Sequence, residues 1–543
     1  MSLSLTPERK AEGKANFEAA VHRHASRRDF MKGLLAAGAA VPVTAAAYFG
    51  YQKLKGNPVK VGLIGAGDEG GVLVGEHNPE YLRFVAVADM RPSNLKRIFE
   101  GEATGPRKGF NRLYGREAAQ IKKYEDYRQL LADKEIEAVV IALPLHLHAP
   151  VAIDAMRAPS PKHVLCEKLM AWDVASCKEM IRVADEQDRI LSIGHQRHYS
   201  LLYAHAQEVL RSKELGDIKY IRALWHRNNS WPKLDKDGKP MLDEKGHPLF
   251  RDSWYPPIPK EDRDALDGKI RQLGYRSMEE LVRWRLYQRT GGGLMAELGS
   301  HQLDACSIFL GKVHPVAVSG TGTRSLYRDQ YRNHEREVDD HVFVTFEFPG
   351  ENYYADKNLK AIKDRDDVVV VTYSSISTNK FEPYGECVTG THGTMLVEEE
   401  ASVMLYPEPN PNRPADAGKT TTITVATAGG GKPAADSAGS TGTLEPAKTL
   451  ATGQPALGGG PPSRGYREEM EDFAYCIRMW NQANKKDRRL PRCHGRVAMA
   501  DAIIALTSNV AMRKRQRIEF DPRWFDPASR EVPDGDMKPE TVA

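Results

Sequence analysis

The sequence predicts two folded domains: an N-terminal α/β domain built on a doubly wound parallel sheet, and a C-terminal α+β domain with a large open, mostly antiparallel sheet. From residue 58 onward, short apolar runs such as VKVGLIGAG alternate with helical stretches. Such runs are typical of parallel strands that are covered on both faces. After about residue 215 the strands lengthen and alternate apolar with polar residues, as in DDHVFVTFEF, which indicates a sheet with one solvated face.

The strands of the first domain are expected at intervals between residues 58 and 195. The first is VKVGLIG, and it is followed by FVAVADM (84–90), AVVIALP (138–144), KHVLCEK (162–168) and RILSIGHQ (189–196). The segments between them, such as VASCKEMIRVADEQD, have the apolar spacing of helices. Strands that alternate with helices in this way predict a parallel sheet.

The second domain is expected at residues 196–407 and 466–530, because two segments interrupt its pattern. Residues 408–465 are rich in Pro, Gly, Ala, Ser and Thr and hold almost no bulky apolar residue, so we expect a flexible insertion. Residues 232–265 read as a surface excursion with two hairpin turns at Asp-Gly and Lys-Gly pairs. Helices are expected after the insertion, at REEMEDFAYCIRMW and GRVAMADAIIALTSNVAMRKRQ.

Composition excludes several classes of protein. The 543 residues carry 77 Lys+Arg against 73 Asp+Glu, and a net charge of +4 on this length does not indicate binding to nucleic acid or to an anionic membrane. The six cysteines are scattered without a C-x-x-C pair, so neither a zinc ribbon nor a disulfide framework is predicted. We expect the cysteines to be small buried residues and predict no metal site.

Residues 1–57 precede the first domain and resemble an export signal. The run SRRDFMK at 26–32 follows a charged leader and precedes a weakly apolar, alanine-rich segment at 33–50. This order is typical of twin-arginine signals, whose translocon carries folded proteins. We therefore expect a periplasmic or membrane-tethered protein with the twin-arginine translocon as a partner. A single membrane anchor is one alternative, and a cytoplasmic protein with a non-functional remnant of the signal is another.

The first strand ends in a motif that is typical of dinucleotide-binding domains. The motif G-x-G-x-x-G consists of Gly65, Ala66, Gly67 and Gly70 with two acidic residues between the last two glycines. Glycines let the backbone approach a pyrophosphate at a helix N-terminus, and Asp89, at the end of the second strand, can accept a hydrogen bond from a ribose 2′-hydroxyl. We therefore predict NAD or NADP as the cofactor. Asp89 favours NAD, whereas Arg91 nearby keeps NADP open.

The two acidic residues inside this motif count against tight binding. Asp68 and Glu69 bring negative charge to the turn where an anionic pyrophosphate would lie. Either residue could instead cap the following helix. A tight turn in a fold that has lost its ligand is the structural alternative.

The segment GGGLMAELGSHQLD, residues 291–304, carries three ionisable groups. In a helix, Glu297, His301 and Asp304 would project within a narrow sector, since spacings of four and three straddle the turn of about 3.6 residues. Alcohol oxidation needs a proton acceptor that titrates near neutrality, and a lysine close by would stabilise a negative oxygen. A buried histidine that is satisfied by Glu297 or Asp304 is the structural alternative.

Together these motifs resemble the glucose–fructose oxidoreductase and inositol dehydrogenase family (Gfo/Idh/MocA) from about Pro58 to Asp526. LPLHLHAP is similar to the family's T-P-N-x-x-H-A segment, VLCEKLM to its E-K-P motif, and IGHQRHY to its turn into the second domain. GGGLMAELGSHQLD is similar to its G-G-G-x-x-x-D-x-G-x-H-x-x-D motif. The sequence departs from these patterns at Leu145, where asparagine is usual, at Leu169, where proline is usual, and at Glu297, where aspartate is usual.

The resemblance implies specific roles for the residues of these motifs. His301 would be the general base on a secondary hydroxyl, Lys168 would hydrogen-bond the developing alkoxide, and Glu297 would orient the imidazole. The hydride would go to the cofactor. The cofactor site would also include residues that follow the fourth and fifth strands: Leu143, Pro144, His148, Glu167 and Lys168.

The approach to the three glycines, LVRWRLYQRTGGG, is rich in planar aromatic and guanidinium groups. Such groups suit a polyhydroxylated or anionic sugar, which they bind by stacking and by forked hydrogen bonds. The candidate substrate contacts are Trp284, Arg285 and Tyr287, with Arg197 from IGHQRHY. A helix that packs Trp284 into the domain interface is the structural alternative.

The predicted function is an NAD(P)-dependent oxidoreductase that acts on a secondary hydroxyl of a sugar or polyol. An exported dehydrogenase has no cofactor pool to exchange with, so we expect a retained cofactor and a redox-neutral cycle. That cycle could couple two sugars, or oxidise a sugar transiently to allow glycoside elimination, hydrolysis or epimerisation. A non-catalytic exported sugar-binding protein is the rival class. A homo-oligomer is expected through the exposed sheet around HVFVTFEF, residues 341–348.

Overall fold

A computed structural model describes the two domains and much of the N-terminal segment. The described residues are 5–34, 45–52, 54, 56–242, 246, 248–327, 336–356, 361–382, 384–410, 412, 463–482, 484 and 488–537. Side chains at 22, 24–34 and 47 are not described. The side chains of the twin-arginine motif and nearly all of the predicted insertion at 408–465 therefore lie outside the described residues.

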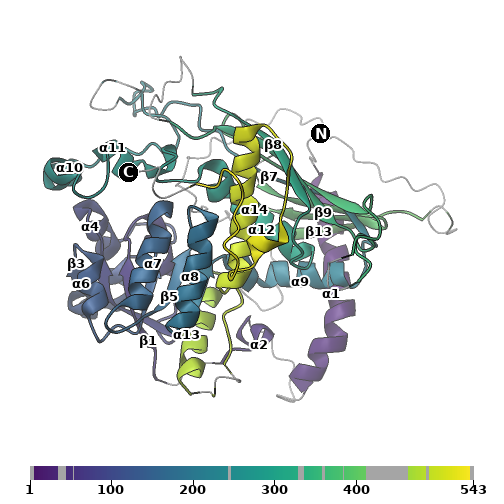
Figure 1. Ribbon diagram of the computed structural model, residues 1–543, viewed down its shortest axis with the longest axis horizontal. Helices are drawn as coiled ribbons and strands as arrows, with labels where there is room; N and C mark the ends of the chain where they lie inside the picture. The colour runs from purple at the N-terminus through teal and green to yellow at the C-terminus, as the bar shows by residue number, and fades with distance from the viewer. Residues whose placement is uncertain are drawn as a thin grey trace.

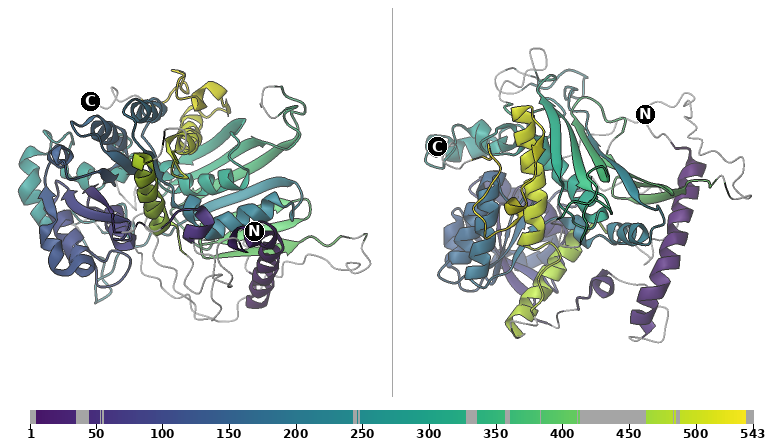
Figure 2. Two further views of the ribbon diagram at one scale, coloured as in Figure 1. Left: turned by 90° about the horizontal axis from the view of Figure 1, so that it is seen from below. Right: turned by 45° about the vertical axis from the view of Figure 1, so that its right-hand side comes forward.

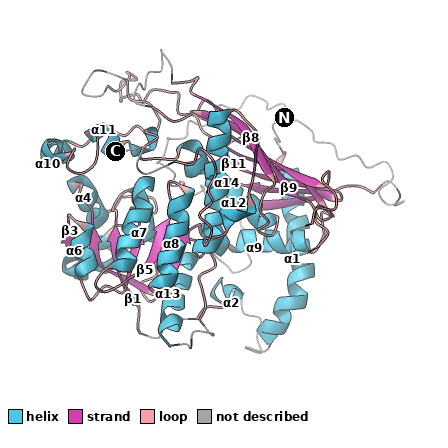
Figure 3. Ribbon diagram, in the orientation of Figure 1, coloured by secondary structure: helices cyan, strands magenta, loops and turns pink. Residues whose placement is uncertain are grey.

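The first domain is built on a six-stranded parallel sheet (Figure 3). Its order is β3-β2-β1-β4-β5-β6. The strands are β1 Val59–Ile64, β2 Leu82–Ala88, β3 Lys122–Tyr124, β4 Ala138–Ile141, β5 His163–Glu167 and β6 Leu191–Gly194. The helical segments between them are α3 Asp68–Glu76, α4 Pro92–Glu100, α5 Phe110–Tyr114, η1 Gly115–Gln120, α6 Tyr127–Ala132, η2 Leu145–Leu147, α7 His148–Arg157 and α8 Val174–Glu186. The predicted doubly wound parallel sheet is confirmed.

Burial explains why these strands read as continuous apolar runs. Every residue of β4, β5 and β6 is buried, and β1 is buried except at Lys60. Helices lie on both faces of a parallel sheet, so neither side of a strand meets water. Two helices from the end of the chain complete this cover, since α13 (Tyr466–Gln482) packs against α3 and α14 (Gly495–Lys514) packs against α8 (Figure 1).

The second domain is built on an eight-stranded sheet of order β13-β12-β11-β7-β10-β9-β8-β14. All of its pairs are antiparallel except that of β7 with β10, so the predicted open, mostly antiparallel sheet is confirmed. The strands are β7 Ile218–His226, β8 Ala317–Thr323, β9 His341–Pro349, β10 Val368–Ile376, β11 Tyr384–Gly390, β12 Gly393–Glu398, β13 Ser402–Pro407 and β14 Ile518–Glu519. The helical segments are η3 Gln196–Tyr199, α9 Leu201–Arg211, the π-helix η6 Met295–Gly299, α12 Ser300–Phe309 and η9 Pro522–Phe525.

A cap projects from the second domain toward the first. It comprises residues 258–290 and contains α10 Lys260–Leu266, η4 Asp267–Lys269, α11 Met278–Val282 and η5 Trp284–Leu286. Its own small core is formed by seven buried side chains: Ile258, Leu266, Ile270, Tyr275, Met278, Leu281 and Val282. Figure 1 shows α10 and α11 beyond the end of α4, so the cap stands across the carboxyl edge of the first sheet.

The N-terminal segment contacts the second domain. Helix α1 (Pro7–Leu34) runs beside the outer sheet edge (Figure 2), where Lys10 pairs with Glu398 at 2.7 Å and the Asn16 amide donates to the Leu405 carbonyl. Helix α2 (Ala45–Phe49) lies against α13. Within the described part of the chain, no helix has the length and apolar character needed to cross a membrane.

Candidate functional site

At each of the three glycines of the motif, a different steric feature of the structure explains the absence of a side chain. Gly65 has φ +96°, and a Cβ there would lie 2.3 Å from the Ala142 carbonyl oxygen. A Cβ on Gly70 would lie 2.2 Å from the Gly65 carbonyl oxygen, so this glycine permits close packing of α3 on the turn. A Cβ on Gly67 would meet nothing within 4 Å, which means that open space lies over the N-terminus of α3. This cradle fits the pyrophosphate of a dinucleotide, with peptide N–H groups of α3 as its donors.

Asp89 closes the cradle from the end of β2. Its carboxylate accepts hydrogen bonds from the peptide N–H of Ala66 at 2.7 Å, from the peptide N–H of Arg91 at 2.8 Å and from the Asn94 amide at 3.0 Å. These bonds fix the carboxylate at the position where the fold class binds the ribose. Ala66, predicted as a cofactor-binding residue, orients Asp89 through its peptide N–H.

The two acidic residues of the motif do not leave an open negative charge in the cradle. Asp68 pairs with Arg97 of α4 at 2.7 Å. Burial raises the pKa of Glu69, against the opposing effect of Lys168, and burial beside Glu69 raises the pKa of Glu167 well above its usual range. Both shifts favour the neutral acids, which reduces repulsion of an anionic ligand.

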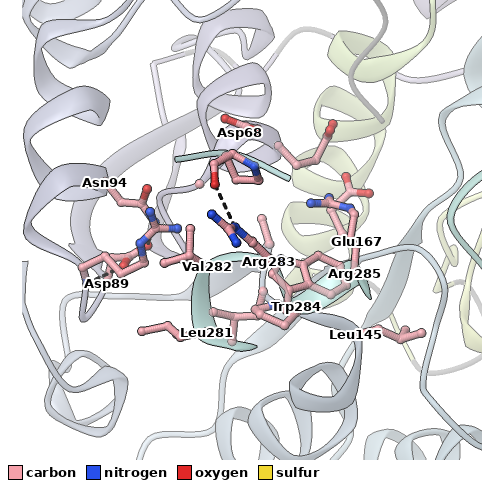
Figure 4. Close-up of a pocket in the computed structure, with 18 of the residues that line it drawn as sticks. Asp68, Asp89, Asn94, Leu145, Glu167, Leu281, Val282, Arg283, Trp284 and Arg285 are labelled. Atoms are coloured by element: carbon pink, nitrogen blue, oxygen red, sulfur yellow. Dashed lines mark hydrogen bonds between the residues drawn. The ribbon is translucent and has the colours of Figure 1, made fainter. Parts of the chain in front are cut away.

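A cavity of about 440 Å³ runs from this cradle to the segment that carries His301. Figure 4 shows Asp89 and Asn94 at one end of the cavity, and Glu167 and Arg285 at the other. The predicted site residues that line it are Gly65, Gly67, Asp89, Arg91, Leu143, Pro144, His148, Glu167, Lys168, Trp284, Arg285, Glu297 and His301. Its volume and its mixed polar lining suit a cofactor together with a small substrate.

The predicted catalytic groups meet at the inner end of this cavity. Lys168, directly after β5, donates from Nζ to the backbone carbonyl of Glu297 at 2.9 Å. The ring of His301 is buried and lies 5.6 Å from the ring of Trp225, between centroids. Among the described residues, neither ring nitrogen of His301 has a hydrogen-bond partner. Its imidazole is therefore free to meet a ligand in the cavity that it lines.

The local helix geometry differs from the predicted stripe. Residues 295–299 form the π-helix η6 and only from Ser300 does α12 begin, so Glu297 and His301 do not share one regular α-helical face. The Glu297 carboxylate bonds to Arg285 Nε at 2.7 Å, and no bond to the His301 ring is found in the described part of the chain. The structure therefore does not show the expected orienting contact from Glu297 to the imidazole, because an arginine of the cap takes its carboxylate.

Burial and neighbouring charges set the protonation of these groups. Burial, together with the charges of Lys168 and Arg197, lowers the pKa of His301 well below its usual value. Burial also lowers the pKa of Lys168, although Glu297 and Glu167 oppose the shift. Burial alone would raise the pKa of Glu297, but Arg285 and Lys168 hold it below its usual value. At neutral pH the site thus holds a neutral imidazole beside an ionised glutamate.

Arg197 is not a substrate contact. Its side chain is fully buried, bonds to Glu386 at 2.9 Å and Glu400 at 2.6 Å, and donates to the carbonyl oxygen of His301 at 2.6 Å. It therefore braces α12 from behind the site. The motif predicted a substrate contact, but the sequence does not reveal that Glu386 of β11 and Glu400 of the turn between β12 and β13 pair with Arg197.

The other predicted residues have varied surroundings. His148 lies between the carbonyl oxygens of Leu143 and Leu169, at 2.9 and 2.8 Å, and so ties two turns that form the floor of the cavity. Trp284 and Arg285 line the cavity and stack on each other, with the guanidinium 4.2 Å from the ring centroid. Tyr287 is buried under Arg276 and is absent from the cavity wall.

Asp304 belongs to a buried polar cluster behind the site. It accepts from His198 Nε2 at 2.8 Å and from Lys312 Nζ at 2.7 Å, and Lys312 also bonds to Asp501. Ligand atoms of His195, Asp304 and Asp501 lie within 4.8 Å of one another. The Lys312 ammonium already supplies positive charge between the carboxylates of Asp304 and Asp501.

The sequence did not reveal several residues that line the cavity or hold its lining in place. Trp254, Asp262 and Tyr466 come from the surface excursion, the cap and the helix after the insertion, none of which carries a recognisable motif. Trp254 and Tyr466 line the cavity, whereas Asp262 holds residues that do. The one available signal was the run of prolines in YPPIPKEDR, which marks a rigid turn just before α10.

Comparison with known proteins identifies both domains. Residues 59–195 match the family described as "Oxidoreductase family, NAD-binding Rossmann fold" (GFO_IDH_MocA), and residues 268–394 match the "GFO/IDH/MocA C-terminal domain". Inositol 2-dehydrogenase of Salmonella typhimurium is 35% identical over 116 residues, which are 21% of this chain and 34% of that protein. Inositol 2-dehydrogenase of Rubrobacter xylanophilus is 28% identical over 178 residues, 31% of this chain and 44% of that protein. The chain thus spans about a third to under half of these relatives.

Solved structures share the fold across both domains. The aldose-aldose oxidoreductase of Caulobacter crescentus, solved with glycerol, has a TM-score of 0.51 at 17% identity and covers 86% of this chain and 100% of its own. The WlbA dehydrogenase of Bordetella pertussis, solved with NADH and UDP-GlcNAcA, has a TM-score of 0.52 at 15% identity and covers 86% and 99%. The fold is thus shared along the chain, and residues 59–195 and 268–394 are similar, in this order, to the NAD-binding and C-terminal domains of the GFO/IDH/MocA oxidoreductases.

Proposed function

We propose that the protein is an NAD(P)-dependent oxidoreductase that acts on a secondary hydroxyl of a sugar or polyol. The observation that carries this proposal is the neutral imidazole of His301, without a partner among the described residues, beside Lys168 in one cavity with an open glycine cradle. The inositol dehydrogenases and the aldose-aldose oxidoreductase to which the chain is similar support a CH–OH substrate. When bound, the nicotinamide would supply the hydride acceptor.

His301 is the proton acceptor in this proposal. A general base must be unprotonated at working pH and within reach of the hydroxyl. The lowered pKa keeps the imidazole neutral, and its ring nitrogens have no competing partner among the described residues. Arg197 fixes the backbone at His301 from behind, so the ring is held without using its nitrogens.

Lys168 stabilises the substrate oxygen. Its Nζ has three N–H donors, of which one bonds to the Glu297 carbonyl. The remaining donors can meet an oxygen that gains negative charge as its proton leaves. Arg285 neutralises the Glu297 carboxylate at 2.7 Å, which prevents that carboxylate from drawing the lysine side chain away.

The predicted export signal leads to the second part of the proposal. The protein is carried out through the twin-arginine translocon with its cofactor bound, and it acts in a redox-neutral cycle as a periplasmic or tethered protein. Folded segments on both sides of residues 35–44 support export after folding. Ala20 and Val21 of α1 are buried, and so are Phe49 and Tyr51, whose hydroxyl donates to Glu471 at 2.8 Å. Cleavage near Ala47 would therefore release α1 and leave the later contacts in place.

Assembly into a homo-oligomer through the second sheet is also proposed. Strand β9 alternates buried with more exposed residues, and Phe343 on its outer face is 50% exposed. An apolar ring at this exposure on an open sheet face is a common feature of subunit interfaces. Light scattering of the purified protein, compared with a Phe343→Glu variant, measures this directly.

The experiment for the proposed function uses protein produced in a host that is competent for twin-arginine export. Protein from the exported fraction is denatured, any nicotinamide cofactor is identified by mass spectrometry, and absorbance at the reduced-cofactor band is followed with myo-inositol and aldoses. One equivalent of NAD(H) or NADP(H) and a sugar-dependent absorbance change are expected. A protein that carries no cofactor and binds none when it is added would refute the enzyme and leave a sugar-binding protein.

A further inference from the structure

One of the contacts between the cap of residues 258–290 and the first domain has no role in the catalytic proposal. That contact is made by Asp262, in the first turn of α10. Its carboxylate is fully buried and accepts three hydrogen bonds from the start of α4: Arg91 Nε at 2.8 Å, the Ser93 peptide N–H at 3.0 Å and Ser93 Oγ at 2.7 Å. Met90, next to this point, packs against the core of the cap.

Asp262 occupies the capping position of α4. The residue at the N-cap of this helix, Arg91, offers no capping acceptor of its own. A carboxylate that accepts the second peptide N–H of a helix satisfies an otherwise unpaired donor and interacts favourably with the helix dipole. Here the carboxylate comes from residues 258–290 of the second domain. The peptide N–H of Ser93 therefore has this acceptor only while residues 258–290 lie against α4.

The same contacts engage donors that could otherwise bind a 2′-phosphate. In this fold class an acidic residue at the end of the second strand binds the ribose 2′-hydroxyl, and an arginine nearby accommodates the 2′-phosphate of NADP. Asp89 is the acidic residue, and Arg91 and Ser93 are the donors beside it; all three line the cavity. Asp262 takes both Arg91 Nε and the Ser93 hydroxyl, and Arg97 is paired with Asp68.

We propose that Asp262 is a clasp that closes the cap over bound NAD(H) and excludes NADP(H). This inference rests on the proposed dinucleotide site and extends it to the choice of cofactor and its retention. A 2′-phosphate, with nearly two negative charges, would meet Asp89 and Asp262 and would have to displace a buried ion pair. Opening of the cap over the cavity would break all three bonds to Asp262, so in this proposal they slow the release of the cofactor.

The test compares Asp262→Ala with Asp264→Ala in the full-length protein. Asp264 lies two residues along the same helix, is 61% exposed and pairs with Lys260 on its own helix, so it is a matched control. Cofactor that copurifies is identified by mass spectrometry, and the dissociation constants and release rates of NAD⁺ and NADP⁺ are measured by calorimetry and stopped-flow fluorescence on stripped protein. None of these readouts depends on turnover.

The wild type and Asp264→Ala are expected to retain NAD(H) and to bind NADP⁺ weakly. In Asp262→Ala, the freed Arg91 and Ser93 should strengthen NADP⁺ binding by about 10- to 100-fold, since each hydrogen bond to a charged group contributes about that factor at most. Release of NAD⁺ should become about tenfold faster or more. Adding Arg91→Ala to Asp262→Ala should remove the gain in NADP⁺ affinity.

Three results overturn the inference. These are a wild type that retains NADP(H), an Asp262→Ala protein with unchanged constants for both cofactors, and a gain in NADP⁺ affinity that survives loss of Arg91. If Asp262→Ala does not fold, Asp262→Asn keeps the shape of the side chain without its charge, and the same three outcomes apply to it. A protein that binds neither cofactor refutes the proposed function itself, whereas one that binds both cofactors equally refutes only the clasp.

Discussion

Replacement of Gly67 by alanine separates the folding role of the glycine motif from its binding role. Gly67 has φ −73° and ψ −157°, an extended conformation that alanine adopts, and a Cβ added there would meet no atom within 4 Å. The change should leave the cofactor-free protein folded, with an unfolding free energy within about 1 kcal/mol of the wild type. Alanine has fewer unfolded conformations to lose, but it is a poorer residue than glycine at the N-cap of α3, which Gly67 occupies.

The same methyl group would stand in the space where the cradle receives a pyrophosphate. Inserting one methylene-sized group into a filled site costs about 1–3 kcal/mol, so we expect NAD⁺ affinity to fall by about 10- to 100-fold. Calorimetric titration of stripped protein measures the affinity, and urea unfolding of the same samples measures stability.

Gly70→Ala is the matched control for this prediction. Its Cβ would lie 2.2 Å from the Gly65 carbonyl oxygen, so the turn or α3 must move and the protein should lose about 1–3 kcal/mol of stability even without cofactor. Wild-type NAD⁺ affinity in a stable Gly67→Ala protein would refute the assignment of the open space to the cofactor. Equal stability of the two variants would refute the steric reasoning.

Four further expectations follow from the site, the buried histidines and Arg197. Replacing Lys168 by Met or His301 by Asn should lower turnover by about 10²- to 10⁴-fold while cofactor is retained, and wild-type turnover in either variant would contradict its role. Because burial holds the pKa of His301 well below 6.5, the acid limb of turnover against pH should lie below pH 6.5. Burial lowers the pKa of His163 and His195 to about 3, so below pH 6.5 the unfolded chain binds more protons than the folded protein. Each histidine then lowers the unfolding free energy by up to about 1.4 kcal/mol for every pH unit of acidification. Urea unfolding at pH 7 and pH 5 measures this loss, and a gain of stability on acidification would contradict it. Arg197→Met should lower the unfolding free energy by about 3–5 kcal/mol, because buried Glu386 loses its ion-pair partner and buried Glu400 keeps only Arg464. In protein that still folds an unchanged KM is expected, which a direct sugar contact would not allow.

The success and failure of the site predictions have a common physical reason. The sequence could place Lys168 and His301 at the cavity because each has a fixed position in a local motif: Lys168 directly follows a buried strand, and His301 lies in the segment after the three glycines. Arg197 and Glu297 also stand in motifs, but their roles depend on partners more than ten residues away in the chain, namely Glu386 and Glu400 for the first and Arg285 for the second. Periodicity carries no information on such pairings.

The same distinction holds for the second sheet. Its long alternating strands were predicted from their pattern, since one face is solvated and the other is packed. Short or glycine-containing strands such as β8 and β14, and the parallel pairing of β7 with β10, have no local signature. The order of strands follows from how the chain crosses over the sheet, which is a property of the whole domain.

By itself the sequence determined what local pattern encodes: the α/β class, the parallel strands that are buried on both faces, the glycine cradle with its acidic partner, and the lysine and histidine of the site. Only the tertiary structure decided which charges meet. It paired Asp262 of the cap with the start of α4, turned Glu297 toward Arg285, and buried Arg197 between two glutamates. The physical reason is that hydrogen bonds and ion pairs act over a few ångströms in space, whereas the residues that form them here are from 12 to more than 200 positions apart in the chain.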